Sequence, residues 1–140
     1  MNDRPNDLRR IRHEIGKIKS FDQMGVEERF QNYTLRPILK LQNPLFLAVF
    51  QNYFFKHKGV FHELSMEKRL TYIENAIFKN QKFRNFLKGI VIGHFTIQEY
   101  KEYSESSSSI NKRMMQMVME RIKNQIEFFE SVDQKKQARI

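Results

Sequence analysis

Apolar residues in this chain recur at intervals of three and four positions, and this spacing constrains the fold more than any other feature. In residues 110–131, steps of 3, 4, 4 and 3 separate the apolar positions Met115, Val118, Ile122, Ile126 and Phe129. Such steps place side chains on one face of an α-helix, whereas a half-buried strand requires strict alternation. The β-branched run 89–93 has no alternating partner segment, and a lone strand leaves its backbone groups unpaired, so we predict a helix there as well.

The same spacing predicts helices along most of the chain. The expected segments are 8–19, 26–36, 44–57, one that Ser65 opens and Asn80 ends, one from Asn80 to about residue 90, 96–103, and 110–131. Residues 44–57 are apolar nearly all round, which is typical of a fully buried helix. We therefore predict an all-α fold, a compact bundle of about six or seven helices in a single domain over residues 1–140, with the 44–57 helix at its centre.

Local signals predict where several helices begin and end. Pro37 predicts a kink or a break, because proline disfavours the helical conformation of the residue before it, and Ile38, Leu39 and Leu41 are expected to continue in a second short helix. Asn43 and Pro44 predict a restart, since Asn is a favoured N-cap and Pro fits the first helical position. Thr96 and Glu99 have the spacing of a capping box, in which each side chain bonds the backbone of the other.

Three segments are expected to lie outside the helical bundle. Residues 1–22 are predicted to be a basic amphipathic arm, or alternatively to dock on the bundle through a helix, because Leu8, Ile11, Ile15 and Ile18 share one helical face and basic residues occupy the others. Residues 104–109 (SESSSS) are of low complexity and predict a flexible loop. Residues 132–140 are predicted to be a frayed basic tail.

Composition excludes several classes of protein. The chain has no cysteine, which excludes disulfide scaffolds, thiolate zinc sites and cysteine nucleophiles and fits a reducing cytoplasm. The N-terminus lacks the apolar core of a secretory signal peptide. The longest apolar run, residues 45–50, has six residues, whereas a transmembrane helix needs about 20. We therefore expect a cytoplasmic protein.

No motif for catalysis or cofactor binding is found in the sequence. The four histidines, His13, His57, His62 and His94, lack the spacing of a metal pair, and the five glycines form no phosphate-binding loop. The serine run shows no nucleophile-elbow pattern. We predict no cofactor, no metal and no catalytic residue.

The net charge of +9 predicts attraction to polyanions, because 25 Lys and Arg face 16 Asp and Glu. Candidate phosphate-binding residues fall in three clusters. They are Arg9, Arg10 and Arg12 in the arm, Lys79, Lys82, Arg84 and Lys88 in the middle, and Lys112 and Arg113 near the last helix start.

Two of these clusters carry a further signal. In the middle cluster, basic residues alternate with Phe83 and Phe86, as they do on surfaces where phosphates are neutralised and bases stack. The spacing of these rings also fits burial in the core. Lys112 and Arg113 are expected in the first turn of their helix, where the dipole disfavours cations; with the serine hydroxyls they predict a phosphate site or, alternatively, a solvated pair.

Four segments together carry a family resemblance: EERFQNYTLRPILKLQN (27–43), KHKGVF (56–61), KFRNFLKGIVIGHFT (82–96) and NKRMMQMVMERI (111–122). They resemble a family of short bacterial proteins of unknown role, whose members often carry the label glyoxalase. The resemblance covers about residues 24–130. Glyoxalase I enzymes hold a divalent metal with His, Glu or Gln on the strands of βαβββ modules. No residue here matches that motif, so the resemblance implies the activity without any site residue.

These observations lead to three functional hypotheses. The first is a non-catalytic basic module that binds RNA or a ribonucleoprotein such as the ribosome. The second is an adaptor that docks the Met-rich residues 114–119 or the N-terminal helix on an acidic protein partner. The third is a glyoxalase-type lyase, as the family label implies. The oligomeric state stays open.

Overall fold

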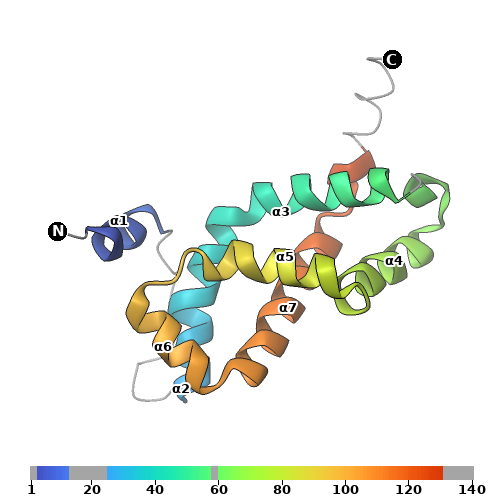
Figure 1. The fold of residues 1–140 in the computed structure, drawn as a ribbon. Helices are drawn as coiled ribbons and strands as arrows, with labels where there is room; N and C mark the ends of the chain where they lie inside the picture. The colour runs from blue at the N-terminus through green and yellow to red at the C-terminus, as the bar shows by residue number, and fades with distance from the viewer. Residues whose placement is uncertain (1–2, 13–24, 58–59, 131–140) are drawn as a thin grey trace.

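Every regular element in the described part of the chain is helical (Figure 1). The structure, a computed structural model, describes residues 3–12, 25–57 and 60–130. Their α-helices are α1 (Arg4–Ile11), α2 (Val26–Phe30), α3 (Arg36–Lys56), α4 (Met66–Phe78), α5 (Gln81–Ile92), α6 (Ile97–Glu105) and α7 (Ser107–Asn124). A π-helical turn, η2 (Gln31–Leu35), joins α2 to α3, and a 3-10 turn, η3 (Val60–Glu63), precedes α4. The all-α prediction is confirmed, and no helix in these ranges has the length and hydropathy to cross a membrane.

The second half of α3 lies at the centre of the core, as its sequence predicts. Its residues Phe46, Phe50 and Phe54 have no exposed surface. The Phe50 ring lies 5.8 Å from that of Phe61 and 5.2 Å from that of Phe129, so it links η3 and the C-terminal end of the described chain. Burying one such side chain stabilises the fold by about 1.5–3 kcal/mol. α5 and α7 pack against this core from other sides and contribute Leu87, Val91 and Val118.

The helix does not break at Pro37, because α2, η2 and α3 follow one another without a gap. Pro37 follows directly on the π-helical turn, in which the backbone N–H of Arg36 reaches back to the carbonyl of Gln31. In a regular α-helix a proline ring collides with the carbonyl four residues earlier. The π turn departs from the regular α-helical hydrogen-bond ladder directly before Pro37, and the helix continues through the proline without a break.

The predicted restart at Asn43 and Pro44 is also wrong, since both residues lie inside α3. Pro44 removes one backbone hydrogen bond, to the carbonyl of Lys40, but Pro44 and Lys40 are both exposed and water can replace the missing donor. Asn43 caps no helix. Its side chain donates to Oε1 of Gln125 at 2.8 Å and accepts from Nε2 of Gln125 at 2.7 Å, which ties α3 to the end of α7.

Three predicted helix starts are confirmed. The Ser65 hydroxyl accepts a hydrogen bond from the Lys68 N–H at the start of α4, and Asn80 Oδ1 accepts from the Phe83 N–H at the start of α5. The capping box of α6 is complete, because Thr96 and Glu99 each accept from the backbone N–H of the other. Asn80 thus marks the boundary between α4 and α5, and Thr96 begins α6 after a short turn that follows α5.

The predicted flexible loop at residues 104–109 is wrong. α6 continues to Glu105, and α7 begins at Ser107 after the single linking residue Ser106. The buried side chains Tyr103 and Ile110 lie on either side of this link, and Tyr103 donates a hydrogen bond to Asn111 at 2.6 Å. Both helices are therefore held against the core close to the link, which leaves no length of chain for a loop.

The N-terminal helix differs in position from the prediction of 8–19. α1 spans Arg4–Ile11, with Pro5 in its first turn, where proline is favoured. Arg12 already has extended backbone, with ψ of 144°. The rest of the predicted arm, residues 13–22, and the predicted tail, residues 132–140, lie outside the described residues.

Candidate nucleic-acid interface

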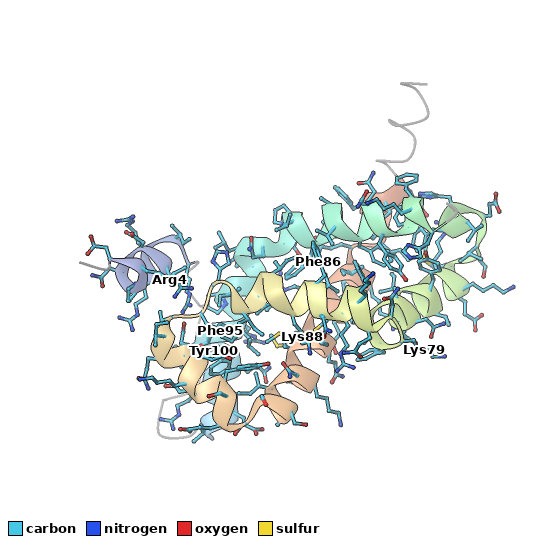
Figure 2. All side chains as sticks on the ribbon, viewed as in Figure 1. Arg4, Lys79, Phe86, Lys88, Phe95 and Tyr100 are labelled. Carbon is cyan, nitrogen blue, oxygen red and sulfur yellow. The ribbon has the colours of Figure 1, made fainter. Side chains whose placement is uncertain are left out.

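The predicted basic residues occupy different places on the molecule rather than one surface. Arg4 ties α1 to the end of α5 by donating to the Gly93 carbonyl at 3.0 Å. Figure 2 shows Arg4 and Lys79 at opposite ends of the view, with Lys88 between them. Arg9 and Arg10 are exposed on α1, which Arg4 ties to the end of α5 that is remote from Lys79. Arg10 pairs with Asp7 at 2.8 Å.

Arg12 is not a surface residue, contrary to its assignment as a phosphate-binding residue. Its side chain is only 9% exposed and donates to both carboxylate oxygens of Glu99, at 2.6 and 2.5 Å. It also donates to the His94 carbonyl at 2.6 Å. A guanidinium engaged in this way holds the start of the chain against α6 and is not available to a phosphate.

Lys112 and Arg113 do not lie in the first turn of the last helix, as predicted. Because α7 begins at Ser107, they fall in its second turn, where the dipole effect has faded. Arg113 donates to Gln31 Oε1 at 2.8 Å. Both basic residues line a cavity of about 390 Å³ together with Glu27 and Glu28. These carboxylates oppose anion binding. Lys112 and Arg113 therefore lack the helix-start position and the positive surroundings that would favour a phosphate site.

The Met-rich stripe of residues 114–119 belongs to the core rather than to a docking surface. Met114 and Met115 have no exposed surface, and Met117 and Met119 are partly buried against the core. The adaptor hypothesis therefore loses this stripe as its contact surface.

Lys79 follows the end of α4, whereas the rest of the middle cluster lies on α5, whose only charged residues are Lys82, Arg84 and Lys88. Lys82 is exposed on the side of α5 that faces α3, and Phe86, one turn later, is 56% exposed on the same side. Figure 2 shows Phe86 on this side and Lys88 on the opposite side of the helix. The α5 members of the cluster thus divide between two edges of a helix that carries no acidic residue.

The other edge of α5 is less accessible. Arg84 is half-buried, with its guanidinium carbon 5.9 Å from the centre of the Phe78 ring. Its Nε is buried and makes no hydrogen bond within the described residues. Lys88 is half-buried as well. The exposed cations of the middle cluster are therefore Lys79 and Lys82.

A groove of about 590 Å³ separates α5 from α3, and we call it the α3–α5 groove. Its lining residues are Ala48, Val49, Asn52, Tyr53, Lys56, His57, Asn80, Lys82, Phe83 and Phe86. The α3 wall supplies Lys56 and His57, which sequence reasoning did not assign to a site. Their only signal was a basic run at a helix end, where cations are expected for the dipole alone.

Aromatic rings form the inner part of this groove. The Tyr53 ring stacks on His57 with 4.0 Å between the ring centres, and Phe83 lies 4.2 Å from Tyr53 on the other side. Asn80 donates to the Tyr53 hydroxyl at 3.2 Å, so the cap of α5 also fixes this ring. Phe83 is half-buried, which fits the core interpretation of its spacing, whereas Phe86 is free to contact a ligand.

A second cavity of about 450 Å³ adjoins the α3–α5 groove, because Tyr53 and Asn80 line both. The remaining lining residues of this cavity are Tyr72, Asn75, Ala76, Lys79 and Gln81. Burial, and to a smaller extent the neighbouring Tyr53, raises the pKa of Tyr72 to about 12, so its hydroxyl stays protonated at neutral pH. Among the described residues, no aspartate or glutamate lines either cavity.

Comparison with known proteins adds no functional assignment. The chain matches no family model, no curated protein and no solved structure. Within the described ranges, no group of three or more His, Asp or Glu is arranged to hold a metal ion.

Proposed function

We propose that this protein binds RNA, alone or within a ribonucleoprotein such as the ribosome, through the α3–α5 groove and its adjoining cavity. The observation that carries the proposal is that Lys56, Lys79 and Lys82 line these cavities beside exposed Phe86, with no carboxylate among the described residues of the lining. The proposed role is non-catalytic and cytoplasmic. The absence of cysteine fits the reducing conditions of that compartment.

The absence of carboxylates from the described lining matters because the chain is not uniformly basic. It has 16 acidic residues, and two of them, Glu27 and Glu28, line one cavity together with Lys112 and Arg113. Charges more than about 10 Å apart are largely screened at physiological salt, so the local balance of charge decides where a phosphate binds. That balance favours the start of α5 over the other two clusters.

The neutral side chains at this surface also suit RNA. Asn52, Asn75 and Gln81 offer both donors and acceptors around the lysines. RNA-binding surfaces combine such groups with aromatic rings on which bases stack, and with cations that follow the phosphate backbone. All three components occur here within two adjoining cavities.

Paired charge reversals test the proposal. The double variant Lys79→Glu/Lys82→Glu removes two exposed cations from the proposed interface, and Lys112→Glu/Arg113→Glu makes the same change in charge at a distant site. Affinity for a mixed cellular RNA pool is measured across a salt series. We expect the first variant to bind far more weakly than the second, with a salt slope smaller by about 0.7 for each phosphate that the protein no longer neutralises.

Equal losses of affinity in the two double variants would show that binding follows net charge alone and would overturn the interface. Heparin, added as a competitor, separates RNA recognition from attraction to any polyanion. Wild-type protein that prefers heparin to RNA at physiological salt would overturn the function itself.

A further inference from the structure

Phe86 is an exposed aromatic residue at the edge of a groove that already contains stacked rings. Its side chain is 56% exposed, so the hydrophobic core does not require an aromatic residue at this position. The opposite wall of the groove presents the stacked rings of Tyr53 and His57. A flat ligand that enters this space meets Phe86 on the α5 side and the exposed His57 end of the ring stack on the α3 side.

We infer that the α3–α5 groove binds one unstacked base of single-stranded RNA, with Phe86 as the stacking partner. This inference rests on the proposed RNA-binding function and adds the form of RNA that is recognised. The groove volume of about 590 Å³ lies within the range of sites for flat organic ligands, which is about 300–1,000 Å³. Base stacking on an aromatic side chain tolerates any sequence, because every base has a π-face.

The lysines are placed to bind the phosphates beside such a base. Lys82 precedes Phe86 by one helical turn and is exposed on the same side of α5, and Lys56 lies on the α3 wall. Lys79 extends the positive charge into the adjoining cavity. A strand that places one base against Phe86 therefore meets cations on both sides of the groove.

Double-stranded RNA does not fit this arrangement. In a duplex the faces of the bases are covered by their neighbours, and the A-form grooves present phosphates, 2′-hydroxyls and base edges. The lysines at the start of α5 still attract the phosphates of a duplex, but Phe86 has no base face to contact. We therefore expect the groove to discriminate between single and double strands.

An acidic protein segment is a less suitable occupant. A docked amphipathic helix needs a row of apolar anchors at i, i+3 or i+4, and i+7. The α5 wall offers a single strongly exposed ring, Phe86. Of the residues three or four positions away on the same face, Phe83 is half-buried, and Lys82 and Gly89 offer no apolar anchor. One exposed ring with flanking cations suits one base and its phosphates better than a row of apolar side chains.

The experiment uses Phe86→Ala, with Phe86→Tyr as the conservative variant and Tyr100→Ala as the control. Tyr100 is 49% exposed on α6 and lines neither cavity. The probes are a 12-nucleotide single-stranded RNA, the same backbone with abasic positions, a 12-base-pair RNA duplex and heparin. We expect Phe86→Ala to weaken binding of the single strand roughly 5- to 150-fold, as the removal of one stacked base predicts, while Phe86→Tyr retains affinity.

The other probes separate this site from simple charge attraction. Phe86→Ala should leave the affinities for the abasic strand, the duplex and heparin unchanged, because these offer no base to stack, and its melting temperature should equal that of the wild type. Lys79→Glu/Lys82→Glu should weaken binding of all four probes. Unchanged single-strand affinity in Phe86→Ala would overturn the base site, whereas the lysine variant separately decides whether RNA binds this surface at all. Displacement of the single strand by a glutamate-rich amphipathic helical peptide at lower concentration than unlabelled RNA would overturn the inference in favour of a peptide site.

Discussion

Arg12 and Glu99 are 87 positions apart in the chain, yet their side chains form a two-bonded ion pair that is nearly buried. The pair fastens the residue that follows α1 to the first turn of α6. Thr34, from the π-helical turn η2, donates a further hydrogen bond to Glu99 at 2.8 Å. Three distant parts of the chain therefore meet at one carboxylate, which makes Glu99 central to the position of the N-terminal helix.

Removal of one partner of this pair should destabilise the protein strongly. Arg12→Ala leaves the Glu99 carboxylate largely buried without its cation, and such changes cost about 3–5 kcal/mol. We expect the free energy of unfolding from urea titration to fall by about 3 kcal/mol or more. Arg10→Ala is the matched control, because its pair with Asp7 is exposed and such pairs contribute less than about 1 kcal/mol. A similar decrease in both variants would contradict the assignment.

Acidic pH should destabilise the protein in two stages. Burial, followed by the charges of Arg12 and Arg4, lowers the pKa of His94 below its ordinary value of 6.5. For Glu99, burial raises the pKa, but the hydrogen bonds from Arg12, the Thr96 backbone and Thr34 together lower it below its ordinary value of 4.5.

For both groups the unfolded chain binds protons more readily than the folded one, so stability decreases as pH falls. The free energy of unfolding should be level above about pH 6.5, decline below it because of His94, and decline further below 4.5 because of Glu99. Urea titrations at a series of pH values measure this profile, and His94→Gln should remove the first decline only. A wild-type profile that stays level between pH 6.5 and 4.5 would contradict the lowered pKa of His94 in the folded protein.

The reciprocal amide pair of Asn43 and Gln125 should show energetic coupling. Asn43→Ala leaves the half-buried Gln125 amide with unsatisfied groups, at a cost of about 1–3 kcal/mol. The double variant Asn43→Leu/Gln125→Leu replaces both partners and should recover much of that stability. A double-mutant cycle of Asn43→Leu, Gln125→Leu and the double variant, followed by thermal unfolding, measures the coupling. Strictly additive effects would mean that the two amides do not support each other in solution.

The parts of the fold that sequence reasoning predicted correctly depend on short-range interactions. Ser65, Asn80 and Thr96 each cap the helix that directly follows them, and each cap involves a residue three positions away. Local propensity and spacing contain all the information that such a cap needs. The central position of residues 44–57 follows in the same way from apolar character alone.

The errors occur where distant residues or register decide the outcome. Nothing near Pro37 in the sequence indicates the π-helical turn that carries the helix past it. Asn43 has the residue type of an N-cap, but Gln125, which lies 82 positions away, uses its amide instead. The serine run has the composition of a loop, and only the burial of Tyr103 and Ile110 on either side shortens it to one linking residue.

The residues of the candidate site likewise fall into those that neighbouring sequence predicts and those that only helix packing brings to the site. The basic and aromatic run 79–88 predicts Lys79 and Lys82, because both lie close together in the sequence. Lys56 and Tyr53 come from α3 and reach the site by helix packing, which spacing along the chain does not reveal. Arg12 was misassigned for the converse reason, since its buried partner Glu99 is remote in sequence.

Lys56 provides the last prediction, because it tests whether the α3 wall belongs to the interface. Lys56→Glu reverses a cation on the α3 wall of the groove that Lys82 lines from α5, so RNA should then meet repulsion on one side. We expect weaker binding and a salt slope smaller by about 0.7, the effect of one fewer neutralised phosphate on a single strand. Lys40→Glu is the control, since Lys40 is an exposed lysine on the same helix that lines neither cavity. Binding measured by fluorescence anisotropy across a salt series distinguishes the two variants. If Lys40→Glu weakens binding as much as Lys56→Glu, α3 acts through its overall charge and the groove is not the contact surface.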